Sequence, residues 1–363
     1  MFLAAAKVRR KAYIKDEYMP RPAGRTQKTS RGFTLIELLV VVAIIVVLIA
    51  ILLPSLAGAR RIARTVKCAA QIKAIDLAMS IYASEYNGAI LGGPFTTGAF
   101  LLQPNHSPAY SELYCPNVNQ VNDWSAPAAS YMNIQFDPGP YSANRRSRYV
   151  TLNTAPALLC PENDIQAPSS TNASFQVPVT NLISYVAAVE FQVKTKSGGQ
   201  LPQYVDEPGI QFPGYSPNLN LVGNTSNKVF IADGAKFWEA NQASQTGQNA
   251  LPNVDLGFAG ADSPGGAYGD WGPFDAFTRS YALPNGITYA MRHGSRNPNA
   301  ALTSYKFNVG FFDGHVETMN GLTGADPNIW APSGTVINTS EIDPAKPQVI
   351  STYFNGQTSI TVP

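Results

Sequence analysis

The chain has few of the residues on which metal and catalytic sites most often depend. Its 363 residues include only three cysteines and three histidines. No Cys-x-x-Cys pair occurs, so a zinc ribbon or a thioredoxin-like motif has no support. The sequence also lacks a Gly-x-Ser-x-Gly elbow, a phosphate-binding loop and a dinucleotide-binding fingerprint. A histidine-dependent triad could draw only on His106, His293 and His315. We therefore expect no enzymatic activity, no metal and no resident cofactor.

Charged residues are also scarce, at 14% of the chain, and the two signs are unevenly distributed. Residues 1–32 hold nine Lys or Arg and two acidic residues, which leaves 17 basic and 22 acidic residues in the remainder. That remainder carries a net charge of about −5, so nucleic-acid binding has little electrostatic support. The low charge, with 29 Gly and 28 Pro, predicts a loop-rich, extracytoplasmic domain.

One long apolar run follows the basic segment. Residues 33–53 supply about the 20 apolar residues that a bilayer-spanning helix needs. Nine basic residues precede the run and only four follow it closely, which predicts a cytoplasmic N-terminus and a C-terminal domain outside. These four are Arg60, Arg61, Arg64 and Lys67. A secretory signal peptide is the rival interpretation, but this run is too long for its apolar core. An uncleaved signal anchor remains a further alternative.

The junction between the two segments resembles a known processing signal. The run from Ser30 to Glu37, SRGFTLIE, is similar to the signal of type IV prepilins and type II secretion pseudopilins. This resemblance implies that a prepilin peptidase cuts after Gly32 and that the new N-terminal residue, Phe33, is N-methylated. It also implies assembly roles for Glu37 and Pro54. A carboxylate within lipid is costly, and the new amino group of Phe33 in a neighbouring subunit would compensate it.

A one-sided apolar pattern continues beyond Pro54. Apolar residues recur at steps of three or four, the spacing of one helix face: Ile62, Val66, Ala69, Ile72, Ile75, Met79, Tyr82 and Tyr86. Asn87-Gly88 then predicts the end of the helix. We expect one long helix in two halves, 33–53 in lipid and 54–87 amphipathic, with a kink or loosening at Pro54. Residues 88–363 would form the globular domain, and residues 1–32 a cytoplasmic leader.

The globular part is rich in turns and contains no repeat. Strands are predicted at residues 183–192, 228–232, 286–291, 307–312 and 315–319. Asp313-Gly314 would join the last two through a type I′ hairpin turn. The predicted fold class is α+β, with a long N-terminal helix packed on an antiparallel β-sheet domain, the lollipop architecture of pilins.

Two of the cysteines each precede a proline, which favours extended backbone. In an oxidising compartment we expect a disulfide between these two, Cys115 and Cys160. Two free thiols, or a pair that includes Cys68, remain open.

The C-terminal part combines His293 with Asp313, Gly314 and His315. This pattern is similar to a motif associated with prepilin-type processing, a histidine followed after a gap by Asp-Gly-His-Val, although the gap is long here. We expect a hairpin turn capped by His315 rather than a metal site, with His293 donating a hydrogen bond to the same hairpin. Calcium remains an option for acidic residues in a Gly-rich loop, although their spacing matches no calcium loop. These are Asp255, Asp262, Asp270 and Asp275.

The patterns predict a pilin-like subunit of a type II secretion pseudopilus or type IV pilus, spanning the inner membrane once, with its domain in the periplasm or filament. Expected partners are prepilin peptidase, other pilin or pseudopilin subunits, the inner-membrane assembly platform and membrane lipid, without nucleic acid. One alternative is an anchored binding module, which an exposed platform of Trp124, Trp238, Trp271 or Trp330 would favour. The other is an anchored hydrolase, which perturbed carboxylates around His293 and Asp313 would favour.

Overall fold

The computed structural model of the protein describes ten segments of the chain. They are residues 33–92, 124–137, 150–152, 154–163, 183–192, 215–234, 269–270, 291–295, 300–342 and 346–363. The leader with Gly32, Cys115 and residues 286–290 of one predicted strand lie outside these segments. The chain divides into two compact units, Met1–Leu56 and Ala57–Pro363.

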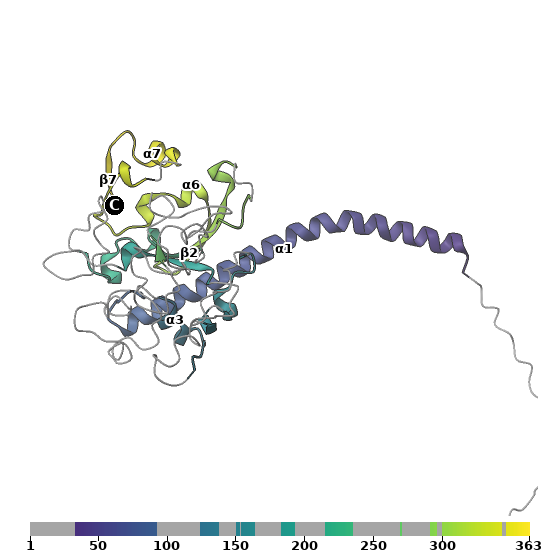
Figure 1. Cartoon of the computed structure of the whole chain (residues 1–363), viewed down its shortest axis with the longest axis horizontal. Helices are drawn as coiled ribbons and strands as arrows, with labels where there is room; N and C mark the ends of the chain where they lie inside the picture. Colours follow the sequence, from purple (N-terminus) through teal and green to yellow (C-terminus); the bar gives the residue numbers. More distant parts are fainter. Residues whose placement is uncertain are drawn as a thin grey trace, which may run out of the picture. The chain divides into compact units, whose positions relative to one another are not determined.

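Helix α1 spans Leu35–Glu85, which confirms the long N-terminal helix (Figure 1). The helix continues through Pro54, and it is long and apolar enough to cross a membrane. The helix ends where Asn87-Gly88 predicts, because these two residues adopt left-handed φ values of 53° and 84°. The Gly88 N–H donates to the carbonyl of Ala83 at 2.7 Å, as in a left-handed helix cap.

The second unit is built on a five-stranded sheet with the order β3-β1-β2-β4-β5. The strands are β1 Tyr185–Ala188, β2 Val229–Asp233, β3 Gly269–Asp270, β4 Lys306–Phe311 and β5 Val316–Asn320. The pairs β1–β2, β2–β4 and β4–β5 are antiparallel, and β3 joins the edge parallel to β1. A long helix with a mainly antiparallel sheet confirms the α+β class.

Shorter elements surround this sheet. They include the helices α3 Ser125–Tyr131, α6 Gly321–Gly324 and α7 Pro347–Tyr353, and β6 Val336–Asn338 pairs antiparallel with β7 Ser359–Thr361. The 3-10 helices are η2 Pro156–Leu158, η3 Val189–Phe191, η5 Leu219–Leu221, η6 Thr225–Asn227, η8 Leu302–Ser304, η9 Pro327–Ile329 and η10 Thr339–Glu341.

Strand β4 separates two packed layers, because successive side chains of a strand point to opposite faces. A Cβ added to Gly310 would lie 2.6 Å from Cγ2 of Ile72, so α1 packs closely on this face. On the other face, a Cβ added to Gly324 in α6 would lie 2.3 Å from the ring of Phe307. The C-terminal half of α1 and helix α6 therefore cover opposite faces of the sheet (Figure 1).

The β4–β5 hairpin is confirmed, but its predicted turn type is wrong. Gly314 has a φ of 88°, whereas Asp313 does not adopt a positive φ. The Gly314 N–H donates to the Phe311 carbonyl at 2.8 Å, and the Phe311 N–H donates to the His315 carbonyl at 3.0 Å. Three residues, rather than two, therefore span the turn, and in such a loop only the last one needs the left-handed conformation.

Two other predicted strands differ from the structure. Within residues 183–192 only Tyr185–Ala188 is a strand, because the 3-10 helix η3 begins at Val189. At the end of the predicted strand 286–291, Met291 is not extended into the sheet. Its neighbour Arg292 makes only an isolated bridge to Lys306.

Candidate functional site

The N-terminal end of α1 is closed by a reciprocal pair of hydrogen bonds. The carboxylate Oε2 of Glu37 accepts hydrogen bonds from the N–H and the Oγ1 of Thr34, both at 2.9 Å. Thr34 Oγ1 in turn accepts the N–H of Glu37 at 3.3 Å. This is a capping box, which satisfies amide groups that a helix start leaves free. Glu37 thus has local partners in the single chain, but both donors are neutral and do not cancel its negative charge.

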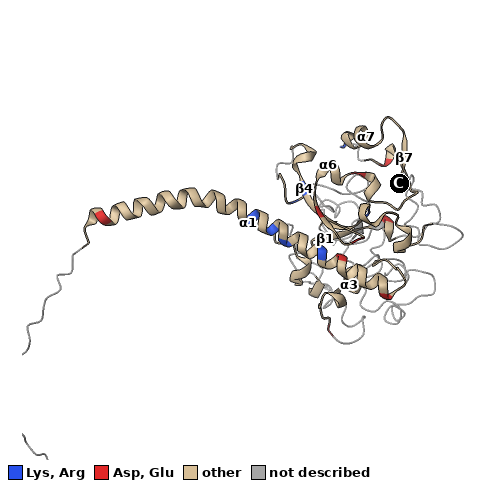
Figure 2. Ribbon diagram, turned by 180° about the vertical axis from the view of Figure 1, so that it is seen from behind, with Lys and Arg blue, Asp and Glu red and all other residues tan. Residues whose placement is uncertain are grey.

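The first half of α1 presents apolar side chains on all sides. Every large apolar side chain from Phe33 to Leu53 is exposed in the single chain, at 45% or more. Figure 2 shows this long uncharged stretch of α1 between an acidic position near its start and basic residues farther along. A helix that is apolar all round requires lipid or other helices as its surroundings.

The second half of α1 has two apolar faces. One is buried in the domain and includes Cys68, Ile72, Ile75 and Met79. The other remains exposed and consists of Ile62, Val66, Leu77 and Ile81, which we call the outer stripe. At about 100° of rotation per residue, the outer stripe lies roughly opposite the buried face. The outer stripe is thus an apolar surface of the second unit that its own domain leaves uncovered.

The predicted packing face was therefore correct only in part. Ile62, Val66 and Tyr86 are 68%, 62% and 54% exposed, so the prediction that they pack on the domain is wrong. Helical spacing shows which residues share a face, but it does not show where along the helix a domain begins to cover that face.

A disulfide joins Cys68 on α1 to Cys160, with their Cα atoms 5.1 Å apart. The predicted Cys115–Cys160 pair is thus wrong, and the alternative with Cys68 is the one the structure adopts. Neighbouring hydrogen bonds tie the same two segments together. Gln71 donates to the carbonyl of Leu159 at 3.2 Å and accepts the Tyr185 hydroxyl at 2.6 Å.

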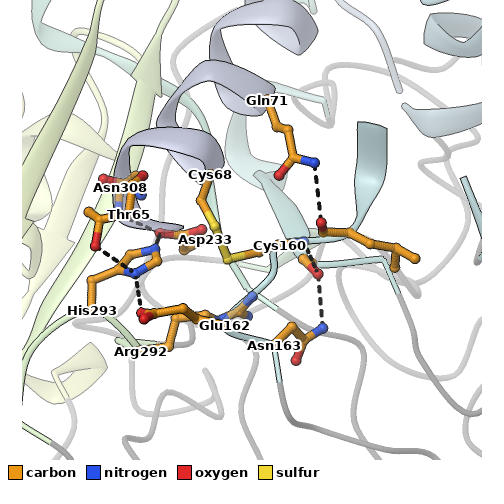
Figure 3. Close-up of a disulfide and its surroundings, with 12 residues drawn as sticks. Thr65, Cys68, Gln71, Cys160, Glu162, Asn163, Asp233, Arg292, His293 and Asn308 are labelled. Atoms are coloured by element: carbon orange, nitrogen blue, oxygen red, sulfur yellow. Dashed lines mark hydrogen bonds and ion pairs between the residues drawn. A yellow bond between two sulfur atoms is a disulfide. The ribbon is translucent and has the colours of Figure 1, made fainter. Parts of the chain in front are cut away.

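His293 lies beside this disulfide, between two buried carboxylates (Figure 3). Its Nδ1 is 2.8 Å from Oε2 of Glu162, and its Nε2 is 3.0 Å from Oδ2 of Asp233. Thr65 Oγ1, from α1, lies 3.3 Å from Nδ1. Asp233 Oδ2 also accepts the backbone N–H of Asn308 at 2.7 Å. Side chains from three distant segments thus contact one imidazole, and β4 holds one of them in place through Asn308.

Acidic and basic groups lie together around His293. Burial lowers the pKa of His293, but the hydrogen bond and charge of Asp233 and the hydrogen bond of Glu162 outweigh it. The nearby charge of Arg292 acts against them, yet the pKa remains above its usual value. Two carboxylates thus lie at the imidazole ring of His293, with the Arg292 guanidinium nearby. Buried charges are tolerated when they are paired in this way.

Comparison with known proteins bears on the N-terminal segment. A family model described as the prokaryotic N-terminal methylation motif matches residues 27–53. The chain carries a type IV pilin-like N-terminus. The matched residues include Gly32, Phe33 and Glu37, and they suit a single-pass membrane anchor. No curated protein and no solved structure matches the chain.

Outside the pilin-like N-terminus, the predicted C-terminal motif is divided between two environments. His315 sits at the exposed hairpin turn, with its Nδ1 2.6 Å from Oδ1 of Asp313 and its ring stacked on Phe311. His293 is buried, and its backbone N–H donates to the carbonyl of Lys306 at the start of β4. The predicted hydrogen bond from His293 to the hairpin is thus made by its backbone N–H. Its imidazole instead contacts the carboxylates of Glu162 and Asp233.

Sequence reasoning did not identify the partners of His293. Glu162 follows Cys160 by two residues, and Asp233 ends a buried strand, but neither position carries a recognisable motif. Only long-range contacts bring them together. Of the acidic residues considered for calcium, Asp270 belongs to β3, and the other three lie outside the described segments.

Proposed function

We propose that this chain is a structural subunit, not an enzyme, of a type IV pilus or a type II secretion pseudopilus. In this proposal a prepilin peptidase cuts between Gly32 and Phe33 and the new N-terminus is methylated. The subunit then assembles with other pilin-like subunits through α1, at an inner-membrane platform. Support comes from the methylation motif at residues 27–53 and from the apolar first half of α1, which overlaps it.

The observation that carries the proposal is Glu37, the single acid in the apolar first half of α1. Its two hydrogen-bond donors come from Thr34 and are neutral. A carboxylate in a low-dielectric medium is stabilised far more by an ammonium than by neutral donors. Cleavage before Phe33 creates such an ammonium in every subunit. A Glu37 carboxylate next to the Phe33 amine of a neighbour would then fix the register of assembly.

The outer stripe gives a second line of support. Lipid tails and the apolar half of α1 are about equally apolar. Inside the membrane, close packing rather than the hydrophobic effect must therefore hold the α1 helices of neighbouring subunits together. Beyond the membrane, exposed apolar residues face water. Burying Ile62, Val66, Leu77 and Ile81 against neighbouring helices would therefore be favourable by the hydrophobic effect. The outer stripe faces away from the chain's own domain and is available for such contacts.

The proposed location follows from charge. Basic residues concentrate before the span, which favours a cytoplasmic N-terminus and an extracytoplasmic domain in the periplasm or filament. An oxidising compartment also suits the Cys68–Cys160 disulfide.

The test compares Glu37→Gln with Glu317→Gln, an exposed carboxylate of the domain. We expect both variants to be cut and methylated like the wild type, as shown by the mass of the mature N-terminal peptide. Only Glu37→Gln should lower the yield of sheared filaments, by at least about tenfold, which corresponds to ~1.4 kcal/mol. Gly32→Val serves as the unprocessed reference. Filament yields of Glu37→Gln equal to the wild type, or a native chain that is never trimmed, would refute the proposal.

The alternative of an anchored binding module gains little support from the described residues. A binding module with an aromatic platform would need exposed tryptophans, whereas Trp124 and Trp330 are fully buried. Trp238 and Trp271 lie outside the described segments.

A further inference from the structure

The disulfide and the buried histidine together form an unusual group of side chains. A ring nitrogen of His293, a carboxylate oxygen of Asp233 and the sulfur atoms of Cys68 and Cys160 all lie within 4.8 Å of one another. All four residues are buried. Two sulfurs, one imidazole and one carboxylate are the ligand types of closed, tetrahedral zinc sites.

We propose that the reduced form of this chain binds one zinc ion through Cys68, Cys160, Asp233 and His293. The metal takes the place of the disulfide, since a sulfur bonded to another sulfur is not a thiolate and cannot ligate zinc in this way. The sequence contains no Cys-x-x-Cys pair, and so it gave no sign of such a site. The two cysteines are separated by 92 positions and meet only in the folded chain.

The geometry suits a small tetrahedral ion. Zinc bonds of about 2.0–2.3 Å place the ligand atoms roughly 3.3–3.8 Å apart. The present group is already close to that size, because every ligand atom lies within 4.8 Å of every other. Breaking the sulfur–sulfur bond allows the two sulfurs to separate towards this distance. The main change needed is a movement of the two cysteine side chains.

One oxygen of the cluster has no partner when the disulfide is formed. Oδ1 of Asp233 is buried and has no hydrogen-bond partner among the described residues. Buried polar atoms without partners are costly in proteins. A metal ion bound by this carboxylate would satisfy it, with Nε2 of His293 already 3.0 Å from the other oxygen, Oδ2.

The surroundings of His293 resemble those of metal-binding histidines. Its Nδ1 is held by the carboxylate of Glu162 at 2.8 Å, which leaves Nε2 as the ligand nitrogen. A carboxylate on the second ring nitrogen is the usual outer partner of a zinc-bound histidine. Two thiolates, Asp233 and Zn²⁺ sum to one negative charge, Glu162 adds a second, and the nearby Arg292 guanidinium cancels one of the two.

Metal and disulfide are mutually exclusive in this arrangement, and each ties α1 to the segment around Cys160. A zinc ion would thus hold α1 to the domain for as long as the two thiols are reduced. Binding releases the two thiol protons to solvent as the thiolates coordinate the ion, together with any proton that Nε2 of His293 carries.

The experiment uses the full chain in a mild detergent. A phosphine reductant opens the disulfide, with the phosphine converted to its oxide by one water molecule and the two cysteines recovered as thiols. The reduced chain is freed of metal with a chelator and titrated with zinc, and bound zinc is measured by mass spectrometry of the metal. Cobalt replaces zinc in a parallel titration, because its spectrum reports thiolate ligands and tetrahedral geometry.

We expect one zinc per reduced chain and none in the oxidised chain. Cys115→Ser is the matched control and should bind zinc like the wild type. Cys160→Ser and Asp233→Asn should weaken binding at least about tenfold, and Glu162→Gln by roughly 10- to 100-fold. Failure of the reduced wild type to bind zinc would overturn the proposal. Equal affinity in Cys160→Ser or Asp233→Asn would overturn it too, because the metal would then lie elsewhere.

A variant that exchanges one ligand for another distinguishes the loss of a ligand from unfolding of the chain. Asp233→Cys replaces one ligand by another of similar size, so it should retain the metal. Its thiolate-to-cobalt absorption should rise about 1.5-fold, since three thiolates replace two. An unchanged absorption at full cobalt occupancy would show that position 233 does not ligate the metal and would also overturn the proposal.

Discussion

Replacing both Cys68 and Cys160 by serine should destabilise the domain strongly. The disulfide closes a loop with a sequence separation of 92 residues. In the chain-entropy description, a loop of this length restricts the unfolded state by about 4.6 kcal/mol at 25 °C. Ordinary domains are stable by only about 5–15 kcal/mol. The predicted loss is thus a large fraction of the domain's total free energy of unfolding.

The assay is urea unfolding of the oxidised full chain in detergent, with a chelator present. Tryptophan fluorescence is a suitable signal because Trp124 and Trp330 are fully buried in the folded domain. With a denaturant slope of about 3 kcal/mol/M, the midpoint should fall by roughly 1.5 M. The reduced wild type should fall by a similar amount.

Cys115→Ser is the control and should keep the wild-type midpoint, since the structure pairs the other two cysteines. A loss below about 1 kcal/mol in the double variant would contradict the entropic argument. A larger loss in Cys115→Ser than in the double variant would show that the pairing itself is wrong.

Two further predictions concern the contact between α1 and β4. Burial raises the pKa of Asp76 well above its usual value, while Lys73 lowers it and Asp313 raises it further. The folded state therefore binds the carboxyl proton of Asp76 more tightly than the unfolded state does. The free energy of unfolding accordingly falls as the pH rises from about 4 through the pKa of the folded state. Asp76→Asn should flatten that decline in urea titrations between pH 4 and 8, and an unchanged slope would contradict this. Gly310→Ala should cost about 1–3 kcal/mol in thermal unfolding, because its Cβ would lie 2.2 Å from Oδ2 of Asp76. Gly58→Ala, with nothing within 4 Å, should be neutral or slightly stabilising, and equal effects would refute the packing argument.

Local signals account for the elements that were predicted correctly. The apolar run and the spacing beyond it predict α1, and Asn87-Gly88 marks its end because glycine accepts the left-handed conformation. The strands around residues 228–232 and 307–319 follow from short apolar runs bounded by turn residues. In each case the information lies within a few consecutive residues.

Burial of polar groups on α1 could not be read from the same spacing. Gln71 and Asp76 lie on the buried face, although their residue types favour solvent. Gln71 is accepted there because Tyr185 and the Leu159 carbonyl, distant in sequence, supply its hydrogen bonds. Such partners are known only when the chain is folded.

The sequence by itself determined the long apolar helix, the N-terminal methylation motif and the position of Glu37, because each depends on the order of adjacent residues. The tertiary structure alone decided that Cys160 pairs with Cys68 and that His293 lies between Glu162 and Asp233. With three cysteines, any of three pairs can be drawn from sequence, and no spacing rule selects among them. The choice is made by the packing of α1 on the sheet, which brings distant segments within bonding distance.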